Sequence, residues 1–218
     1  MHPISNFDVS QYITTIKIKE PSFKTLDQTL GNLKAFSRLR EFQLLKNTNR
    51  HREPMEMKLL QGLSALSILE KLELAINFYS GDCFFNFLEN FSLPASIIAI
   101  KLKLIGVDWK YVVESLKTLK NEDLEVENLF ERNNKLCKRF YQQWENLQHL
   151  KLLSIQILQD EEVNPHVGLD FTVPLLKNLK QLTSFEYVNL CNIETETIDF
   201  QHLWQPLSNL QLQSLYIK

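Results

Sequence analysis

The clearest pattern along the chain is a nine-residue stretch with apolar residues at its first, fourth and sixth places and Asn at its ninth. It occurs at 39–47 (LREFQLLKN) and again at 69–77 (LEKLELAIN). Weaker copies keep most of the apolar places, and the copies begin near residues 13, 39, 69, 97, 121, 147, 182 and 212. Their mean spacing of about 28 residues is typical of a protein built from structural repeats.

Each copy alternates apolar and polar residues, which predicts a β-strand with one buried face. Between the copies, apolar residues recur at the spacing of an amphipathic helix. Strands that are joined by helical crossovers run parallel. The pattern therefore predicts one α/β solenoid domain over residues 1–218, with a parallel, concave sheet of about eight strands and with helices on the convex side. Pro174 is expected to begin one of these helices, and Pro206 to end the last one early.

On the two full copies, which match the pattern LxxLxLxxN, the chain resembles the leucine-rich repeat proteins. Its repeat length is similar to that of the ribonuclease-inhibitor-like type, and the resemblance covers residues 13–217. The resemblance implies a horseshoe-shaped solenoid whose concave sheet binds a protein, without identifying that protein. In this family the ninth-place Asn hydrogen-bonds the backbone of the turn. Here only Asn47 and Asn77 occupy that place in the first seven copies, so irregular turns are expected.

The fifth residue of each copy is expected to point into the hollow of the concave sheet. These residues are Lys17, Gln43, Glu73, Lys101, Glu125, Lys151, Glu186 and Tyr216. From Glu73 to Glu186 the charges alternate in sign, and each exposed pair of opposite charges on neighbouring strands contributes roughly 0.2–1 kcal/mol. Lys71 and His149 stand at third places of the same face, with His149 expected beside Asp123.

This row of charges has two interpretations. It keeps a parallel sheet solvated and in register, or it is a docking surface for a protein or peptide. The seventh places add small apolar patches, with Leu45 beside Ala75 and Leu153 beside Val188. Such patches resemble the apolar anchors of interfaces, but scattered exposed apolar residues are equally consistent with them.

Composition narrows the classes of partner and compartment. The formal net charge is −2, from 24 basic and 26 acidic residues, so the charge does not favour nucleic acid or an acidic membrane surface. The three cysteines are far apart and form no CxxC pair, which favours a reducing, intracellular compartment, with the cytoplasm expected. The N-terminal residues lack the pattern of a signal peptide, and the apolar runs are too short and too charged to span a bilayer.

The sequence carries none of the common motifs of catalysis or cofactor binding. It has no GxSxG, no HExxH and no Walker loop, so neither an enzyme nor a cofactor is expected. The acidic residues from Asp160 to Glu162, with His166, do not have the spacing of a known metal-binding loop, and no metal site is expected. A contact between His149 and Asp123 is more often structural than catalytic, because no nucleophile is evident near them.

These observations predict a non-catalytic scaffold or adaptor that binds a protein partner through the concave sheet. One alternative is the substrate-recognition part of a larger enzyme system, such as a ubiquitin-ligase receptor. A second alternative is a regulator of a small GTPase that uses Arg50 or Arg52. The sequence ends just after a predicted strand, where Leu215 and Ile217 would face an incomplete core. Further repeats or another chain are therefore expected to cover this end.

Overall fold

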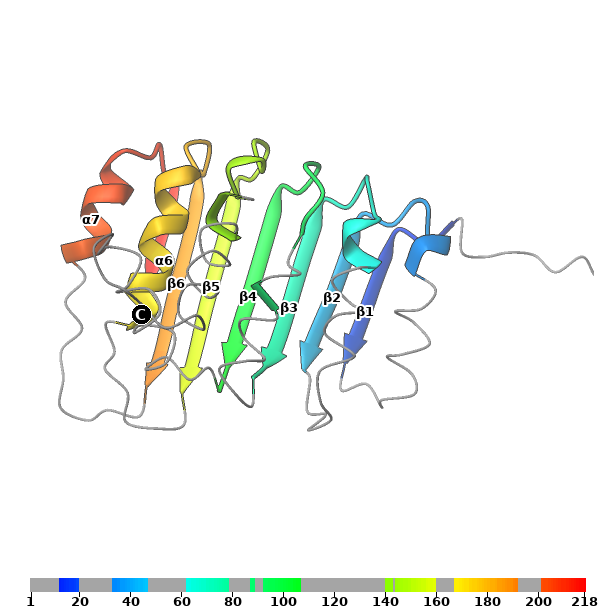
Figure 1. Cartoon of the computed structure of the whole chain (residues 1–218), viewed down its shortest axis with the longest axis horizontal. Helices are drawn as coiled ribbons and strands as arrows, with labels where there is room; N and C mark the ends of the chain where they lie inside the picture. Colours follow the sequence, from blue (N-terminus) through cyan, green and yellow to red (C-terminus); the bar gives the residue numbers. More distant parts are fainter. Residues whose placement is uncertain are drawn as a thin grey trace, which may run out of the picture.

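The fold is a single parallel sheet with helices packed against one face. The computed structural model describes residues 12–19, 33–46, 62–78, 87–88, 92–106, 140–142, 144–159, 167–191 and 201–218, and all statements below concern these residues. Seven strands form one sheet whose spatial order, β1 to β7, is also their order in the chain, and all six neighbouring pairs are parallel (Figure 1). This topology is the one that a chain of strand–crossover repeats predicts.

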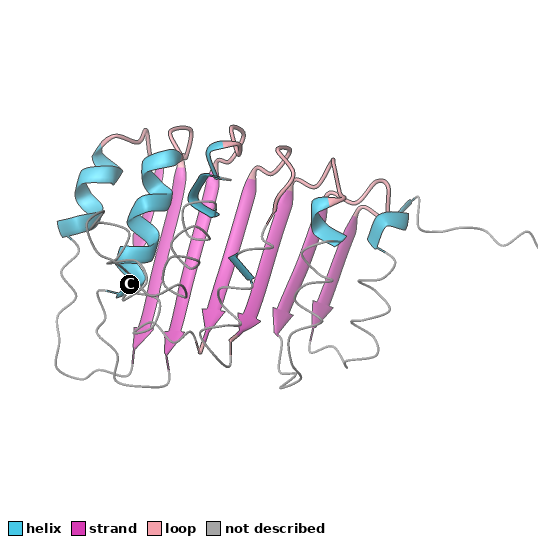
Figure 2. Cartoon of the chain, in the orientation of Figure 1, coloured by secondary structure: helices cyan, strands magenta, loops and turns pink. Residues whose placement is uncertain are grey.

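The elements have the following bounds. The strands are β1 (Thr15–Lys19), β2 (Glu41–Lys46), β3 (Lys71–Asn77), β4 (Ala99–Ile105), β5 (Leu152–Gln159), β6 (Ser184–Cys191) and β7 (Ser214–Ile217). The longer helices are the α-helices α6 (Val167–Asn178) and α7 (Gln201–Ser208), and η2 (Leu33–Ala35) is a 3₁₀ helix. Shorter helical segments lie at 62–64, 87–88, 140–142 and 144–145. Figure 2 shows the helices on one side of the sheet.

The buried face of the sheet is made by the fourth and sixth places of the repeats. Successive side chains of a strand point to opposite faces, so these places share one face. In the inner strands they are apolar and at most 2% exposed, as for Phe42 and Leu44 in β2 or Ile100 and Leu102 in β4. The same hydrophobic cluster contains Leu175 of α6 and Leu203 and Leu207 of α7. The core therefore lies between the sheet and the helices.

The start of each strand is fixed by a repeated hydrogen-bond pattern at the second place of the repeat. The amide groups of Arg40 and Glu41 both donate to the carbonyl of Thr14, at 2.8 and 3.0 Å. The carbonyl of Arg40 accepts two amides of the next repeat in the same way. The carbonyls in this series belong to Thr14, Arg40, Glu70, Ile98, Lys151 and Thr183. This series of backbone hydrogen bonds identifies which residues of the repeats are equivalent, without reference to their side chains.

Two parts of the predicted arrangement are wrong around β5. The copy expected at 121–126 lies outside the described residues, but β4 pairs directly with β5, so no strand separates them. The copy expected from Leu147 is displaced by three residues, because Lys101 pairs with Ser154 and not with Lys151. The crossover between β4 and β5, residues 106–151, is accordingly longer than the others. Gly106, at φ 65°, ends β4 in a conformation that glycine adopts without steric cost.

The predicted effects of the two helical prolines are also corrected. Pro174 does not begin a helix, because it lies inside α6, which starts seven residues earlier. Pro206 lies inside α7, which continues to Ser208. A proline removes one backbone hydrogen bond, and packing of the apolar face offsets that loss. Leu176 and Leu207, near the ends of the two helices, are both buried.

The last strand is the least covered. Leu215 of β7 occupies a fourth place but is 41% exposed, whereas its register partner Phe185 in β6 is 1% exposed. β7 pairs with β6 on one side only among the described residues. The expectation that further repeats or another chain cover this strand stays a prediction.

Candidate functional site

The face of the sheet opposite the helices, called the concave face here, carries three rows of side chains. They stand at the third, fifth and seventh places of the repeats, and each row follows the strand register. The fifth-place row consists of Lys17, Gln43, Glu73, Lys101, Ser154, Glu186 and Tyr216. The seventh-place row, over β2 to β6, consists of Leu45, Ala75, Lys103, Gln156 and Val188.

Most of the residues predicted from the sequence for this face lie together on it. Six of them belong to the fifth-place row: Lys17, Gln43, Glu73, Lys101, Glu186 and Tyr216. Lys71 lies in the third-place row, where it pairs with Glu41 and Ala99 on the neighbouring strands. Their side chains are half-buried or exposed, and Tyr216 is 49% exposed. The arrangement brings charged, polar and aromatic groups from six strands to one accessible surface.

Three predicted residues are not placed in these rows. Glu125 lies outside the described residues. His149 lies in an exposed turn before β5, so its predicted third place on the concave face is wrong, and its predicted neighbour Asp123 is not described. Lys151 is exposed at a second place, where its carbonyl accepts the amides of Thr183 and Ser184 at 2.9 Å each. The five-charge alternation predicted for the fifth-place row is therefore wrong.

The three-residue displacement arises because repeats also carry an apolar residue three places before their first place, and Leu147 is such a residue. The amide of Leu150 donates to the carbonyl of Leu147 at 3.1 Å, as the amide of Leu69 donates to that of Leu66 at 3.2 Å. Leu147 is thus the equivalent of Leu66, which precedes the first place of its repeat. The alternation from Leu153 to Ile157 is the sequence signal that would have given the correct register.

The displacement exchanges core and surface residues of β5. It also places on the concave face two residues that the sequence reasoning missed. Leu153, predicted on the concave face, is 0% exposed in the core. Ser154 and Gln156 take the fifth and seventh places of β5. Ser154 is 1% exposed, and its Oγ has no hydrogen-bond partner in the described part of the chain. A buried hydroxyl without a partner costs roughly 1–3 kcal/mol of stability.

Electrostatic contacts on this side are few. Arg40 and Glu70, at second places of neighbouring repeats, form an ion pair. Gln43 donates from Nε2 to Oε1 of Glu41 at 2.6 Å. Among the described residues, no carboxylate lies within ion-pair distance of Lys101 or Lys103. The charges at the centre of the face are thus open to a partner.

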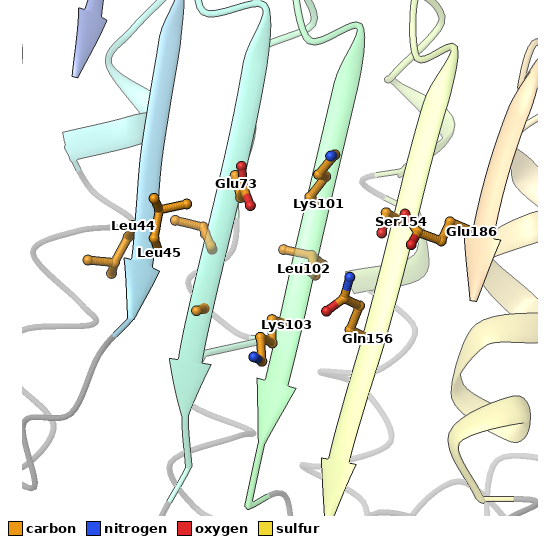
Figure 3. A pocket seen from close by; sticks show the side chains of 11 residues that line it. Leu44, Leu45, Glu73, Lys101, Leu102, Lys103, Ser154, Gln156 and Glu186 are labelled. Carbon is orange, nitrogen blue, oxygen red and sulfur yellow. The ribbon is translucent and has the colours of Figure 1, made fainter. Parts of the chain in front are cut away.

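The centre of the concave face is hollowed. A depression of about 130 Å³ spans β2 to β6 (Figure 3). Ala75, 4% exposed, provides a small side chain between Leu45 and Lys103. The other polar lining residues are Glu73, Lys101, Ser154, Gln156 and Glu186. We call this depression the central hollow.

A second depression, of about 380 Å³, lies over β5 to β7. It is bordered by Glu186, Leu190 and Tyr216. Leu190 is 46% exposed, so apolar surface is accessible here as well. The two depressions share Gln156 and Glu186 and are therefore adjacent on the sheet.

Within the described residues, no three His, Cys, Asp or Glu side chains are grouped closely enough to hold a metal ion. In the same part of the chain, none of the helices has the length and apolar character needed to cross a membrane.

Comparison with known proteins supports the fold. No protein-family model and no curated protein matches the sequence. Thirteen chains of solved structures match. One is described as "Leiomodin-1 Actin-Binding Site 2 (ABS2)"; it is 12% identical, the match covers 88% of each chain, and the TM-score is 0.50. At this identity the likeness concerns the fold alone. Together with the strand order and register, it shows a leucine-rich-repeat-type α/β solenoid with a parallel concave sheet.

Proposed function

We propose that residues 1–218 form a single leucine-rich-repeat domain, of the ribonuclease-inhibitor-like type, that acts as a non-catalytic scaffold in the cytoplasm. It binds a protein partner through the concave face. The observation that carries this proposal is the row of fifth-place side chains, in which Glu73, Lys101 and Glu186 present charges without ion-pair partners among the described residues.

The chemical character of the face supports a protein partner over a polyanion. The central charges have both signs, whereas nucleic-acid grooves present one sign. Apolar surface from Leu45 lies beside them, and exposed Leu190 and Tyr216 lie on β6 and β7. Aromatic and aliphatic groups next to charged ones are the composition of protein–protein interfaces.

The similar solved structure adds a second line of support. Its description names an actin-binding site, so a chain of this architecture serves protein binding in at least that case. Purified actin is therefore one candidate partner to test.

Site-specific photo-crosslinking tests the proposal. A photoreactive amino acid replaces Lys71 on the concave face or, as the matched control, the exposed Gln205 on α7. Each protein is incubated with cell extract and, separately, with purified actin, then irradiated, and the adducts are identified by mass spectrometry. We expect protein adducts that are specific to position 71. Identical adducts from both positions, or adducts from position 205 alone, would contradict binding through the concave face.

A further inference from the structure

The central hollow has an uneven charge distribution that depends on the strand register. Lys103 of β4 pairs with Ala75 of β3 and Gln156 of β5, so its neighbours in the seventh-place row are uncharged. Gln156 in turn pairs with Val188 of β6, which is also uncharged. Lys103 is half-buried and forms no ion pair among the described residues. A partly desolvated ammonium without a counter-charge favours the approach of a carboxylate.

Within the hollow, the fifth-place residues of β4 and β6 have different neighbours. Lys101 has Glu73 as its register partner on β3, so a cation and an anion are neighbours there. Glu186 of β6 has Ser154 and Tyr216 as its partners, and both are uncharged. The unmatched charges of the hollow are thus a cation on β4 and an anion on β6.

The third part of the hollow is apolar and lies over β2 and β3. The small side chain of Ala75 lines it, together with Leu45 of β2, which is labelled in Figure 3. The volume of about 130 Å³ far exceeds the roughly 10–15 Å³ that one water molecule needs. The hollow as a whole therefore has room for side chains of a partner, and Ala75 and Leu45 make its β2–β3 part the apolar one.

The order of these parts across the sheet sets the spacing of a ligand. From β3 to β6 there are three strand gaps of about 4.8 Å each, or about 14 Å. Every second side chain of an extended peptide points to the same side, and four residues span about 13 Å. The apolar and cationic parts are one strand gap apart, or about 5 Å, and the cationic and anionic parts are two gaps apart, or about 10 Å. Alternate side chains of an extended segment are about 7 Å apart. The long side chains of Lys103 and Glu186 cover the difference, so three alternate side chains of one segment reach the three parts in turn.

We propose that the central hollow binds an extended segment of the partner protein with the pattern apolar–x–acidic–x–basic. The segment crosses the strands from β3 to β6. Its apolar side chain lies on Ala75 beside Leu45, its carboxylate pairs with Lys103, and its basic group pairs with Glu186. Gln156, between the two charged positions, donates to the carboxylate from its amide. This inference rests on the proposed function and specifies the chemistry of the partner.

Peptide display tests the pattern. A phage library of random nine-residue peptides is selected on the unchanged protein, on Lys103→Glu, on Glu186→Lys and on Lys180→Glu. The last variant is the matched control, because Lys180 is exposed in the turn between α6 and β6 and does not line the hollow. We expect the unchanged protein and the control to enrich apolar–x–acidic–x–basic peptides.

Charge exchange gives the decisive readout. Lys103→Glu should replace the acidic preference by a basic one, and Glu186→Lys should replace the basic preference by an acidic one, each without altering the other position. A consensus peptide should bind each variant at least tenfold more weakly and regain affinity when its own charge is exchanged at the matching position. Because regained binding requires a folded protein, misfolding cannot imitate this result.

Other outcomes separate the inference from the proposed function. Peptides enriched without a charge preference, or a switch caused equally by Lys180→Glu, would overturn the inference. So would the absence of any enriched peptide. If any of these results is found together with protein adducts at position 71, the proposed binding through the concave face is kept and only the apolar–x–acidic–x–basic segment is rejected. Absence of adducts at that position would reject the proposed function itself.

Discussion

Leu152 and Leu153 are adjacent in sequence but lie on opposite faces of β5, and this pair gives the sharpest test of the strand register. Leu153 is 0% exposed in the core, whereas Leu152 is half-buried on the concave face. Shifting the register by three residues would exchange their environments, because side chains alternate between the faces. Replacing each leucine by alanine in turn therefore compares two identical chemical changes at neighbouring positions.

The two substitutions are expected to differ in magnitude. Leu153→Ala should lower the free energy of unfolding by about 2–5 kcal/mol, because it removes buried methyl groups and leaves a cavity. Leu152→Ala should lower it by less than about 1 kcal/mol, since that side chain keeps part of its contact with water. For a chain of this size, 1 kcal/mol corresponds to about 2–4 °C, so a loss of about 3 kcal/mol lowers the Tm by about 6–12 °C.

Urea denaturation followed by circular dichroism measures both variants against the unchanged protein. Equal slopes of free energy against urea would show that the unfolding transitions are comparable. A larger loss from Leu152→Ala than from Leu153→Ala would refute the register, and so would equal losses.

Two further predictions concern the same strand. Ser154→Ala should raise the free energy of unfolding by up to about 1–3 kcal/mol, because it removes a buried hydroxyl that has no hydrogen-bond partner among the described residues. Ser184→Ala, on the neighbouring strand, is the control and should leave the free energy of unfolding nearly unchanged. Thermal melting measures both variants, and a lower stability of Ser154→Ala would contradict the prediction. Lys101→Cys combined with Ser154→Cys should form a disulfide on mild oxidation, because these positions are register partners. Lys101→Cys combined with Lys151→Cys should not, because three residues along the strand add about 10 Å. Peptide mapping that finds the second bridge and not the first would contradict the register between β4 and β5.

The sequence predicts the strand register correctly where the apolar residues of a repeat fit the nine-residue pattern in only one alignment. Around Leu39 and Leu69, the spacing of apolar residues admits a single register, and the strands β2 and β3 begin two residues after each of these leucines. Around Leu147 the pattern fits two alignments, because apolar residues stand at 147, 150, 152, 153 and 155. The alternation from Leu153 to Ile157 favours the second alignment, and the backbone hydrogen bonds of the preceding turn show that the chain adopts it.

The chemistry of the concave face depends on this register. Residues at 43, 73, 101, 186 and 216 were predictable, because their repeats were aligned correctly. Ser154 and Gln156 were missed because their repeat was misaligned, and they separate Lys101 and Lys103 from Glu186 and Val188. The isolation of Lys103 from other charges follows from contacts between strands that are distant in sequence. For the same reason, the central hollow is visible only in the folded chain.

The account rests on the claim that a protein partner binds to the concave face, and one affinity measurement tests it directly. Glu73→Lys combined with Lys101→Glu exchanges two charges that are register partners, so it preserves the net charge and their mutual attraction. Arg40→Glu combined with Glu70→Arg is the matched control, because it exchanges an ion pair at the edge where the strands begin.

Isothermal titration calorimetry with the partner identified by crosslinking compares the two double variants with the unchanged protein. We expect the first exchange to raise the Kd at least tenfold, which corresponds to about 1.4 kcal/mol, and the control to change it less than about twofold. An unchanged Kd after the exchange of Glu73 and Lys101 would contradict binding through the concave face.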